Sequence, residues 1–186
     1  MIRKRVGILV FPDVEVLDFC GPFEVLLVAE KSGTVVTTGG MKVTPDHTLE
    51  NCPPLDILVV PGGWGTRAEI KNARLVAWIG ERARQVETLT SVCTGSMLLG
   101  QAGLLDGRHA TTHWRALQWM RDSFPAVTVE EKLHVVEDGH VLTSAGISAG
   151  IDMALRVVAR YHGEGVARNT ARNMEYRYPD DNSRRV

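Results

Sequence analysis

Residues 90–100 read TSVCTGSMLLG, a stretch in which a strand pattern changes to a helical one. The residues just before Cys93 are β-branched and apolar, and they predict a short strand. Residues 94–105 have apolar side chains at helical spacing, and they begin with Thr94 and Ser96, which are typical of helix starts. Cys93 therefore stands at a strand-to-helix junction, where a side chain projects out of the sheet beside the free N–H groups of the helix.

Two interpretations of Cys93 are open on this local pattern. Helix-start N–H groups and the helix dipole favour negative charge, so a thiol at this position is expected to have a pKa below its ordinary value and to act as a nucleophile. A free cysteine is, however, more commonly a small buried hydrophobic residue. Only the rest of the chain can distinguish a reactive thiol from a structural one.

The composition is that of an ordinary soluble domain. The chain has 186 residues, of which 44% are hydrophobic and 23% charged, and we expect one domain that spans residues 1–186. The formal net charge of −1 gives no reason to expect nucleic acid or an anionic membrane as a partner, and no apolar run is long enough to span a membrane. Three widely spaced cysteines indicate no disulfide framework and predict a reducing compartment, the cytoplasm.

Strand and helix patterns alternate along the chain. Strands are expected at 5–12, 33–40, 41–49, 56–65 with its glycine-rich turn, 87–93 and 107–114, and as a hairpin around Asp138 and Gly139 at 132–146. Helices are expected at 14–33 after an initial loop, and at 72–85, 94–105, 115–124, 148–163 and 165–176. This alternation predicts an α/β fold, a mostly parallel sheet with helices on both faces.

Three chemistry-bearing segments follow the carboxyl ends of expected strands: 11–22, 61–65 and 93–96. Ligands bind beyond these ends in open parallel sheets, so we expect the three segments to meet there. The first segment contains Asp18, for which two roles are open. Its carboxylate either lies near the Cys93 thiol and accepts its hydrogen bond, or it is an ordinary helix N-cap.

Gly62 and Gly63 also allow two interpretations. They form a tight turn after a strand, or they let main-chain N–H groups approach a ligand closely, because glycine has no Cβ. The N–H of Thr94 would be a further donor for developing negative charge, and its hydroxyl is a candidate group for binding the substrate.

His113 and Ile147 are weaker candidates for the site. His113 follows a strand expected next to the nucleophile, and a Cys–His pair is the usual hydrolase arrangement. The favoured alternative is a histidine packed under Trp114 and hydrogen-bonded to the main chain. Ile147 is expected to line the pocket. Cys20 and Cys52 fit no metal-ligand spacing with the histidines, so no metal is expected.

Two other enzyme classes lack their motifs. The GGWG turn at 62–65 is not followed by the Lys-Ser/Thr of a phosphate-binding loop. The Gly-x-Ser-x-Gly elbow of ordinary serine hydrolases is absent as well. An ordinary serine hydrolase is therefore disfavoured.

Five stretches together resemble the ThiJ/PfpI superfamily of class I glutamine amidotransferase-like domains. The resemblance covers nearly the whole chain in the right order, and it is most specific for the branch that contains isonitrile hydratases and the sensor domains of AraC-type regulators. The stretches are GILVFPDVEVLDFCGPFEV (7–25), PPLDILVVPGG (53–63), TSVCTGSMLLGQAGLLDGRHATTHW (90–114), SAGISAGIDMAL (144–155) and NMEY (173–176).

The resemblance implies a flavodoxin-like three-layer sandwich, a homodimer, and a cysteine on a strained nucleophile elbow after a strand. By motif it makes Cys93 the nucleophile, Asp18 the essential carboxylate and Thr94 the neighbouring group. It implies no metal and no organic cofactor, and a small molecule as substrate. The apolar segment FEVLLVA, read as part of a helix at 23–29, gives modest independent support for pairing with a second copy.

Two departures from the family pattern stand out. The stretch between Glu30 and Pro45 looks shorter than usual, so trimmed or rearranged strands are expected there. No histidine follows Cys93 directly, as one does in PfpI-type proteases, so a peptidase is poorly supported.

The resemblance implies, as a first hypothesis, a cytoplasmic lyase that adds water to an isocyanide and gives an N-formamide. The second hypothesis is a non-enzymatic sensor for a small molecule or for redox state. The third is glyoxalase or deglycase chemistry on reactive carbonyls, which would need His113 near the thiol of Cys93.

Overall fold

A mostly parallel sheet forms the centre of the protein. The computed structural model describes residues 4–20 and 26–185, and within them seven strands form this sheet. All neighbouring pairs are parallel except the pair of β10 and β11 at one edge. The order across the sheet is β10 (Val135–Asp138), β11 (Val141–Ser144), β7 (Thr88–Val92), β6 (Ile57–Val60), β1 (Val6–Leu9), β2 (Leu26–Ala29) and β5 (His47–Thr48).

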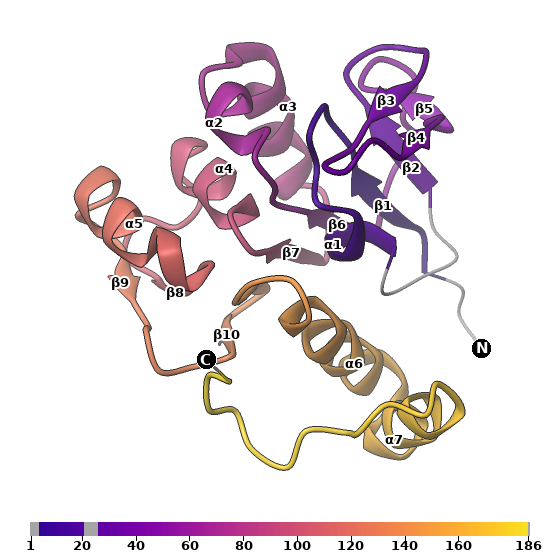
Figure 1. Ribbon diagram of the computed structural model, residues 1–186, viewed down its shortest axis with the longest axis vertical. Coiled ribbons are helices and arrows are strands. Elements are labelled where there is room, and N and C mark those ends of the chain that lie inside the picture. Colours follow the sequence, from indigo (N-terminus) through magenta and orange to yellow (C-terminus); the bar gives the residue numbers. More distant parts are fainter. Residues whose placement is uncertain (1–3, 21–25, 186) are drawn as a thin grey trace.

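Helices cover both faces of the sheet, so the predicted three-layer α/β sandwich is confirmed (Figure 1). One layer contains α2 (Thr66–Glu69), α3 (Ala73–Ala83), α4 (Gly95–Gln101) and α5 (Leu117–Ser123), the last preceded by the 3-10 turn η1 (Trp114–Ala116). The other layer contains α6 (Ala149–His162) and α7 (Glu164–Asn173). The short α1 (Val16–Cys20) follows the carboxyl end of β1.

The central strands and α3 form for the reasons that the sequence suggests. Every residue of β6 and β7 is buried, as expected for parallel strands covered on both faces. Helix α3 begins where the Asn72 side chain accepts a hydrogen bond from the N–H of Leu75 at 3.2 Å. Its apolar side is buried as predicted, including Leu75, Trp78 and Ile79.

The helix expected up to Gly33 is wrong over residues 26–29. These residues form β2, which lies between β1 and β5 inside the sheet, and Val28 and Ala29 are buried there. A short continuous apolar run satisfies a buried strand as well as a helix face, and periodicity alone does not separate the two. The remainder of the FEVLLVA segment, 23–25, lies outside the described residues, so the helix offered as a dimer surface is not supported.

The short strands expected at 33–49 and 107–114 are present in reduced form. Strands β3 (Val35–Val36) and β4 (Lys42–Val43) form a separate two-residue ribbon, and only β5 joins the main sheet. Strand β8 (His109–Ala110) pairs with β9 (Thr128–Val129) outside the main sheet as well. The strands in the stretch after Glu30 are therefore short, with two residues in each of β3, β4 and β5.

The second half of the chain follows the prediction more closely. The hairpin at 132–146 is formed by β10 and β11, and helices α6 and α7 follow it. Helix α5 ends before Pro125, whereas α4 ends at Gln101 and not at residue 105. Among residues 4–20 and 26–185, no helix is both long and apolar enough to cross a membrane.

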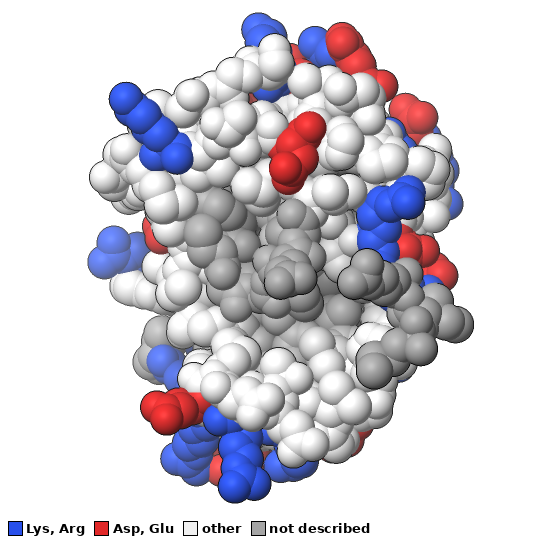
Figure 2. Space-filling model, turned by 90° about the vertical axis from the view of Figure 1, so that its right-hand side faces the viewer, with Lys and Arg blue, Asp and Glu red and all other residues white. Residues whose placement is uncertain are grey.

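Charged side chains are mixed on the face shown in Figure 2. Most basic and acidic side chains lie toward its margins, one acidic side chain lies near the upper centre, and a group of basic side chains with acidic ones beside it lies at the lower edge. The described part of this face therefore presents no continuous basic surface of the kind that binds a nucleic-acid backbone.

Close packing of α4 against β6 predicts the effect of one substitution. A Cβ on Gly95 would lie 2.0 Å from the Val60 carbonyl oxygen, so Gly95→Ala forces the two elements apart. We expect it to lower the free energy of unfolding in urea by about 1–3 kcal/mol. The control is Gly80→Ala in α3, where a Cβ meets no atom within 4 Å and helix propensity predicts a gain of about 0.5–1 kcal/mol. Equal midpoints for Gly95→Ala and the unmodified protein would contradict this packing.

Candidate active site around Cys93

Cys93 occupies a left-handed elbow between β7 and α4. Its φ is 55°, a conformation that costs energy in a residue other than glycine and that persists only where the surroundings hold it. The backbone N–H of Cys93 donates to the carbonyl oxygens of Ser144 and Ala145, at 3.2 and 3.1 Å. Its carbonyl oxygen accepts hydrogen bonds from the hydroxyls of Thr112 and Ser96, at 3.0 and 3.1 Å. The predicted strand-to-helix elbow is present.

The thiol of Cys93 is not acidified, so the expectation of a lowered pKa is wrong. Burial, with the nearby carboxyl of Asp18 as the next cause, raises the pKa of Cys93 to about 12. Hydrogen bonds from the N–H and hydroxyl of Thr94 and from the N–H of Ile147 oppose this rise only in part. The side chain is 6% exposed, and α4 is a helix of only seven residues. Desolvation outweighs the helix-start effect here.

Asp18 is fully buried beside this thiol. Its Oδ2 accepts a hydrogen bond from the N–H of Gly62 at 2.9 Å, whereas its Oδ1 has no partner among the residues described. Burial raises the pKa of Asp18 to about 8, and the Gly62 N–H opposes that rise. At neutral pH the group is therefore mainly a carboxylic acid, with an oxygen free to give or take a proton.

The helix N-cap interpretation of Asp18 does not match its position. Asp18 lies within α1, and its carboxylate contacts a loop 44 residues further along the chain. The carboxyl therefore links α1 to the glycine turn after β6, next to the elbow. The three strand-end segments meet as the topology predicts.

Gly62 and Gly63 bring the turn after β6 against the elbow. A Cβ on Gly62 would lie 2.6 Å from the Thr94 nitrogen and 3.0 Å from the Cβ of Cys93, so only glycine fits. Their N–H groups are both engaged within the protein, that of Gly62 by Asp18 and that of Gly63 by the Thr94 hydroxyl at 3.1 Å. The hydroxyl of Thr66 lies 3.0 Å from that of Thr94. This arrangement holds Thr94 in place.

His113 has the geometry of the structural alternative. Its Nδ1 accepts a hydrogen bond from the backbone N–H of Arg115 at 3.2 Å, and its ring lies 5.8 Å from that of Trp114. A Cβ on Gly146 would lie 2.2 Å from the ring, so the imidazole packs directly on the backbone that precedes Ile147. In the part of the chain that the structure describes, no hydrogen bond joins His113 to Cys93.

Ile147 contributes its backbone to the site. Its φ is 53°, which is a genuine outlier for a β-branched residue, and its N–H acts to lower the pKa of the Cys93 thiol. Its side chain is 37% exposed. The sequence suggested that the Ile147 side chain lines the pocket. It gave no indication that the backbone of Ile147 would be strained or that its N–H would act on the thiol.

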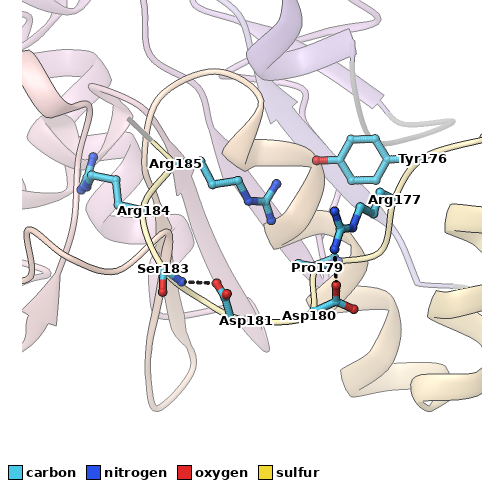
Figure 3. A pocket seen from close by; sticks show the side chains of 8 residues that line it. All are labelled: Tyr176, Arg177, Pro179, Asp180, Asp181, Ser183, Arg184 and Arg185. Carbon is cyan, nitrogen blue, oxygen red and sulfur yellow. Dashed lines mark hydrogen bonds and ion pairs between the residues drawn. The ribbon is translucent and has the colours of Figure 1, made fainter.

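A C-terminal segment, residues 176–185, supports the elbow from outside, which sequence reasoning missed. The guanidinium of Arg184 donates to the Thr111 hydroxyl and to the carbonyl oxygen of Thr112, whose own hydroxyl bonds the Cys93 carbonyl. Figure 3 shows Arg184 and Arg185 extending in opposite directions from this segment, which borders a pocket of about 390 Å³.

Buried Asp152 of α6 anchors the same segment. Its carboxylate accepts a hydrogen bond from the Tyr176 hydroxyl at 2.9 Å and lies 2.8 Å from the guanidinium of Arg185. The Nε2 of buried His134 lies 3.2 Å from it. Through these contacts Asp152 links α6 to His134, which directly precedes β10, and to the C-terminal segment.

Of the two other cysteines, the structure describes only the side chain of Cys52. Cys52 is a free, buried thiol whose pKa is raised by burial, and the Cys20 side chain lies outside the described residues. Within residues 4–20 and 26–185, no cluster of three or more His, Cys, Asp or Glu side chains is suited to hold a metal ion.

Comparison with known proteins adds a family match. Residues 4–160 match the DJ-1/PfpI family. An isonitrile hydratase from Pseudomonas putida is 38% identical over 181 residues, which cover 92% of this chain and 78% of that protein. The HTH-type transcriptional regulator CdhR from Pseudomonas aeruginosa is 35% identical over 86% of this chain, but the match covers only 51% of the regulator.

A solved structure agrees with the fold. The crystal structure of a ThiJ/PfpI family protein from Pseudomonas syringae superposes with a TM-score of 0.89 and 33% sequence identity. The match covers 97% of this chain and 78% of that one. The flavodoxin-like arrangement predicted from the sequence is therefore confirmed.

The raised pKa of Asp18 predicts how stability depends on pH. Between about pH 4 and pH 8 the folded protein holds a proton at Asp18 that the unfolded chain releases, so the free energy of unfolding falls as pH rises. The contribution of one such group changes by at most about 1.4 kcal/mol per pH unit. Asp18→Asn removes it, so the variant should gain stability over the unmodified protein as pH rises from 4 to 8. Parallel stability curves for the two proteins would show that Asp18 titrates normally.

Proposed function

Because the chain belongs to the DJ-1/PfpI family, we propose that it is a cysteine-dependent hydro-lyase that adds water to an isocyanide and releases an N-formamide. The observation that carries this proposal is the buried Asp18 carboxyl beside the Cys93 thiol, with pKa values of about 8 and about 12. At working pH the two groups hold at most one negative charge, and a proton passes between them.

The first step forms a bond between the Cys93 sulfur and the terminal carbon of the isocyanide. The ionised form of Asp18 takes the thiol proton as the sulfur attacks, and it then delivers this proton to the same carbon. The result is a thioimidate, R–N=CH–S–Cys93. Negative charge on the sulfur is favoured by the N–H and hydroxyl of Thr94 and by the N–H of Ile147, all of which act to lower the pKa of the Cys93 thiol.

The second step adds water to the thioimidate carbon. Asp18 accepts a proton from the attacking water, the bond between carbon and sulfur breaks, and the sulfur of Cys93 regains a proton. The nitrogen takes up the other proton, so the products are R–NH–CHO and the free thiol. Isocyanide and water are consumed in equal amounts, and no electrons are exchanged with any cofactor.

A sensor is the second candidate function, and the similarity to CdhR favours it. The match covers most of this chain and half of that regulator, so the same site could bind a small molecule without turnover. Glyoxalase or deglycase chemistry is less well supported, because the Nδ1 of His113 is engaged by Arg115. We propose one domain over residues 1–186 in the cytoplasm, where a reducing environment keeps the thiol free.

Replacing Asp18 tests whether the protein is an enzyme or a domain that only binds a ligand. We expect Asp18→Asn to lower kcat for hydration of a small isocyanide by roughly 100- to 10,000-fold, because an amide cannot carry the proton. In the unmodified protein kcat/KM should rise with pH through about 8 as the pair loses its first proton. Cys93→Ala should abolish turnover.

The controls for this test are folding and a different substrate class. A variant Asp18→Asn that melts normally and retains more than about a tenth of kcat would remove the catalytic role of Asp18. Turnover of α-oxoaldehydes in place of isocyanides would favour the glyoxalase reaction. Absence of turnover on both classes would favour the sensor.

We also propose that the chain forms a homodimer, as the family resemblance implies. Exposed apolar side chains on α1 and the neighbouring β3–β4 ribbon, Leu17, Val36 and Met41, support an interface there. Sedimentation equilibrium at micromolar concentration should give twice the 20.4 kDa mass of one chain. A mass near 20.4 kDa would contradict the dimer.

A further inference from the structure

Exposed indoles stand beside the segments that form the site. Trp64 follows the Gly62–Gly63 turn and is 64% exposed, and Trp114 follows His113 and is 48% exposed. The side chain of Ile147, whose backbone belongs to the site, is also partly exposed. We refer to Trp64, Trp114 and Ile147, which adjoin the segments of the site, as the rim. Large exposed aromatic side chains that gather at one place mark a binding surface more often than a solvated one.

Two arginines are stacked on these indoles. The guanidinium carbon of Arg67 lies 4.4 Å from the ring centre of Trp64 and 5.4 Å from that of Trp119 in α5. That of Arg115 lies 4.8 Å from the Trp114 ring. Stacking orders a guanidinium while leaving its N–H donors at the edge free, so both groups are prepared to bind an anion.

Neither Arg67 nor Arg115 has a carboxylate at ion-pairing distance among residues 4–20 and 26–185. Most other arginines of the protein do have one. The paired arginines are Arg74, Arg108, Arg121, Arg156, Arg160, Arg168, Arg177 and Arg185. Some other described arginines also lack such a partner, among them Arg82, which stacks on the buried Trp78. Arg67 and Arg115 are distinguished by being unpaired and stacked on exposed indoles.

His113 lies within the electrostatic influence of both stacked arginines and adds a neutral donor. Its Nδ1 accepts the Arg115 N–H, so a neutral ring carries its proton on Nε2. Burial lowers the pKa of His113, and three guanidinium groups lower it further, which keeps the ring neutral at pH 7. In decreasing order of effect they belong to Arg115, Arg184 and Arg67. Positive charge therefore converges at this place, and no carboxylate of the described residues 4–20 and 26–185 acts on the ring to offset it.

We propose that this rim selects isocyanides that carry an anionic group, with a carboxylate bound by the edges of Arg67 and Arg115 and the adjoining apolar part covered by Trp64 and Trp114. The inference rests on the proposed hydratase function and names its substrate class. A carboxylate matches the planar fork of a guanidinium, and two such forks hold it better than one. The reacting carbon then points toward the elbow and the charge toward the rim.

A pair of substrates that differ in charge tests this proposal. We expect kcat/KM for isocyanoacetate to exceed that for its neutral methyl ester by about tenfold or more, the usual effect of a hydrogen bond to a charged group. This ratio should fall by about tenfold in Arg67→Gln and in Arg115→Gln, and less in Arg67→Lys, which keeps the charge. High salt should lower the ratio as well.

The control is Arg168→Gln. Arg168 also stacks on an aromatic ring, that of Tyr178, at 4.4 Å, but it is paired with Glu164 in α7. The ratio should not change in this variant. A ratio near one in the unmodified protein, or a ratio that Arg67→Gln and Arg115→Gln leave unchanged, would overturn the proposal while the hydratase function stands.

A binding measurement decides the proposal if no isocyanide is turned over. By calorimetry the protein should bind N-formylglycine, the anionic product, at least about tenfold more tightly than the methyl ester of N-formylglycine. Arg67→Gln should remove this preference. Equal affinities for the two compounds would overturn the anion-selective rim whatever the catalytic activity of Cys93.

Discussion

The site depends on the burial of one carboxyl group. Asp18 has no exposed surface and receives a single N–H donor, from Gly62, so its charged form is poorly solvated. The thiol of Cys93 is buried beside it, and the Asp18 carboxyl makes the loss of the thiol proton more difficult. Their proximity therefore limits the pair to one negative charge, and proton transfer within the pair becomes the available chemistry. The cost of burying Asp18 is a loss of stability at neutral pH, as is common at functional sites.

Close packing of backbone is what keeps this pair together. Glycine at 62 and 95 lets the turn after β6 and the start of α4 approach to distances that no Cβ would permit. Cys93 and Ile147 are both held in left-handed conformations at this site. Such strain persists because many contacts determine it, from Thr112 inside the fold to Arg184 on the C-terminal segment.

Much of the fold could be predicted from the sequence, because alternating strand and helix patterns and buried apolar runs are local properties. The convergence of Asp18, Gly62 and Cys93 followed from topology, since the carboxyl ends of parallel strands share one edge. Residues 26–29 could not be assigned in this way, because a short apolar run suits a buried strand and a helix equally. The direction of the Cys93 pKa depends on desolvation, which a sequence does not display. The support from Arg184 joins residues 72 positions apart and has no local signal.

The central claim is that Asp18 keeps its proton in the folded protein at neutral pH. Carbon-13 NMR of the protein labelled at aspartate side-chain carboxyls measures this directly, with Asp18→Asn to assign the resonance. The account predicts a carboxyl resonance that titrates near pH 8, in a spectrum where exposed aspartates titrate near their ordinary value of about 4. A resonance for Asp18 that titrates at or below about 4 would contradict the account, because the carboxyl would then be fully ionised at neutral pH and burial would not hold its proton.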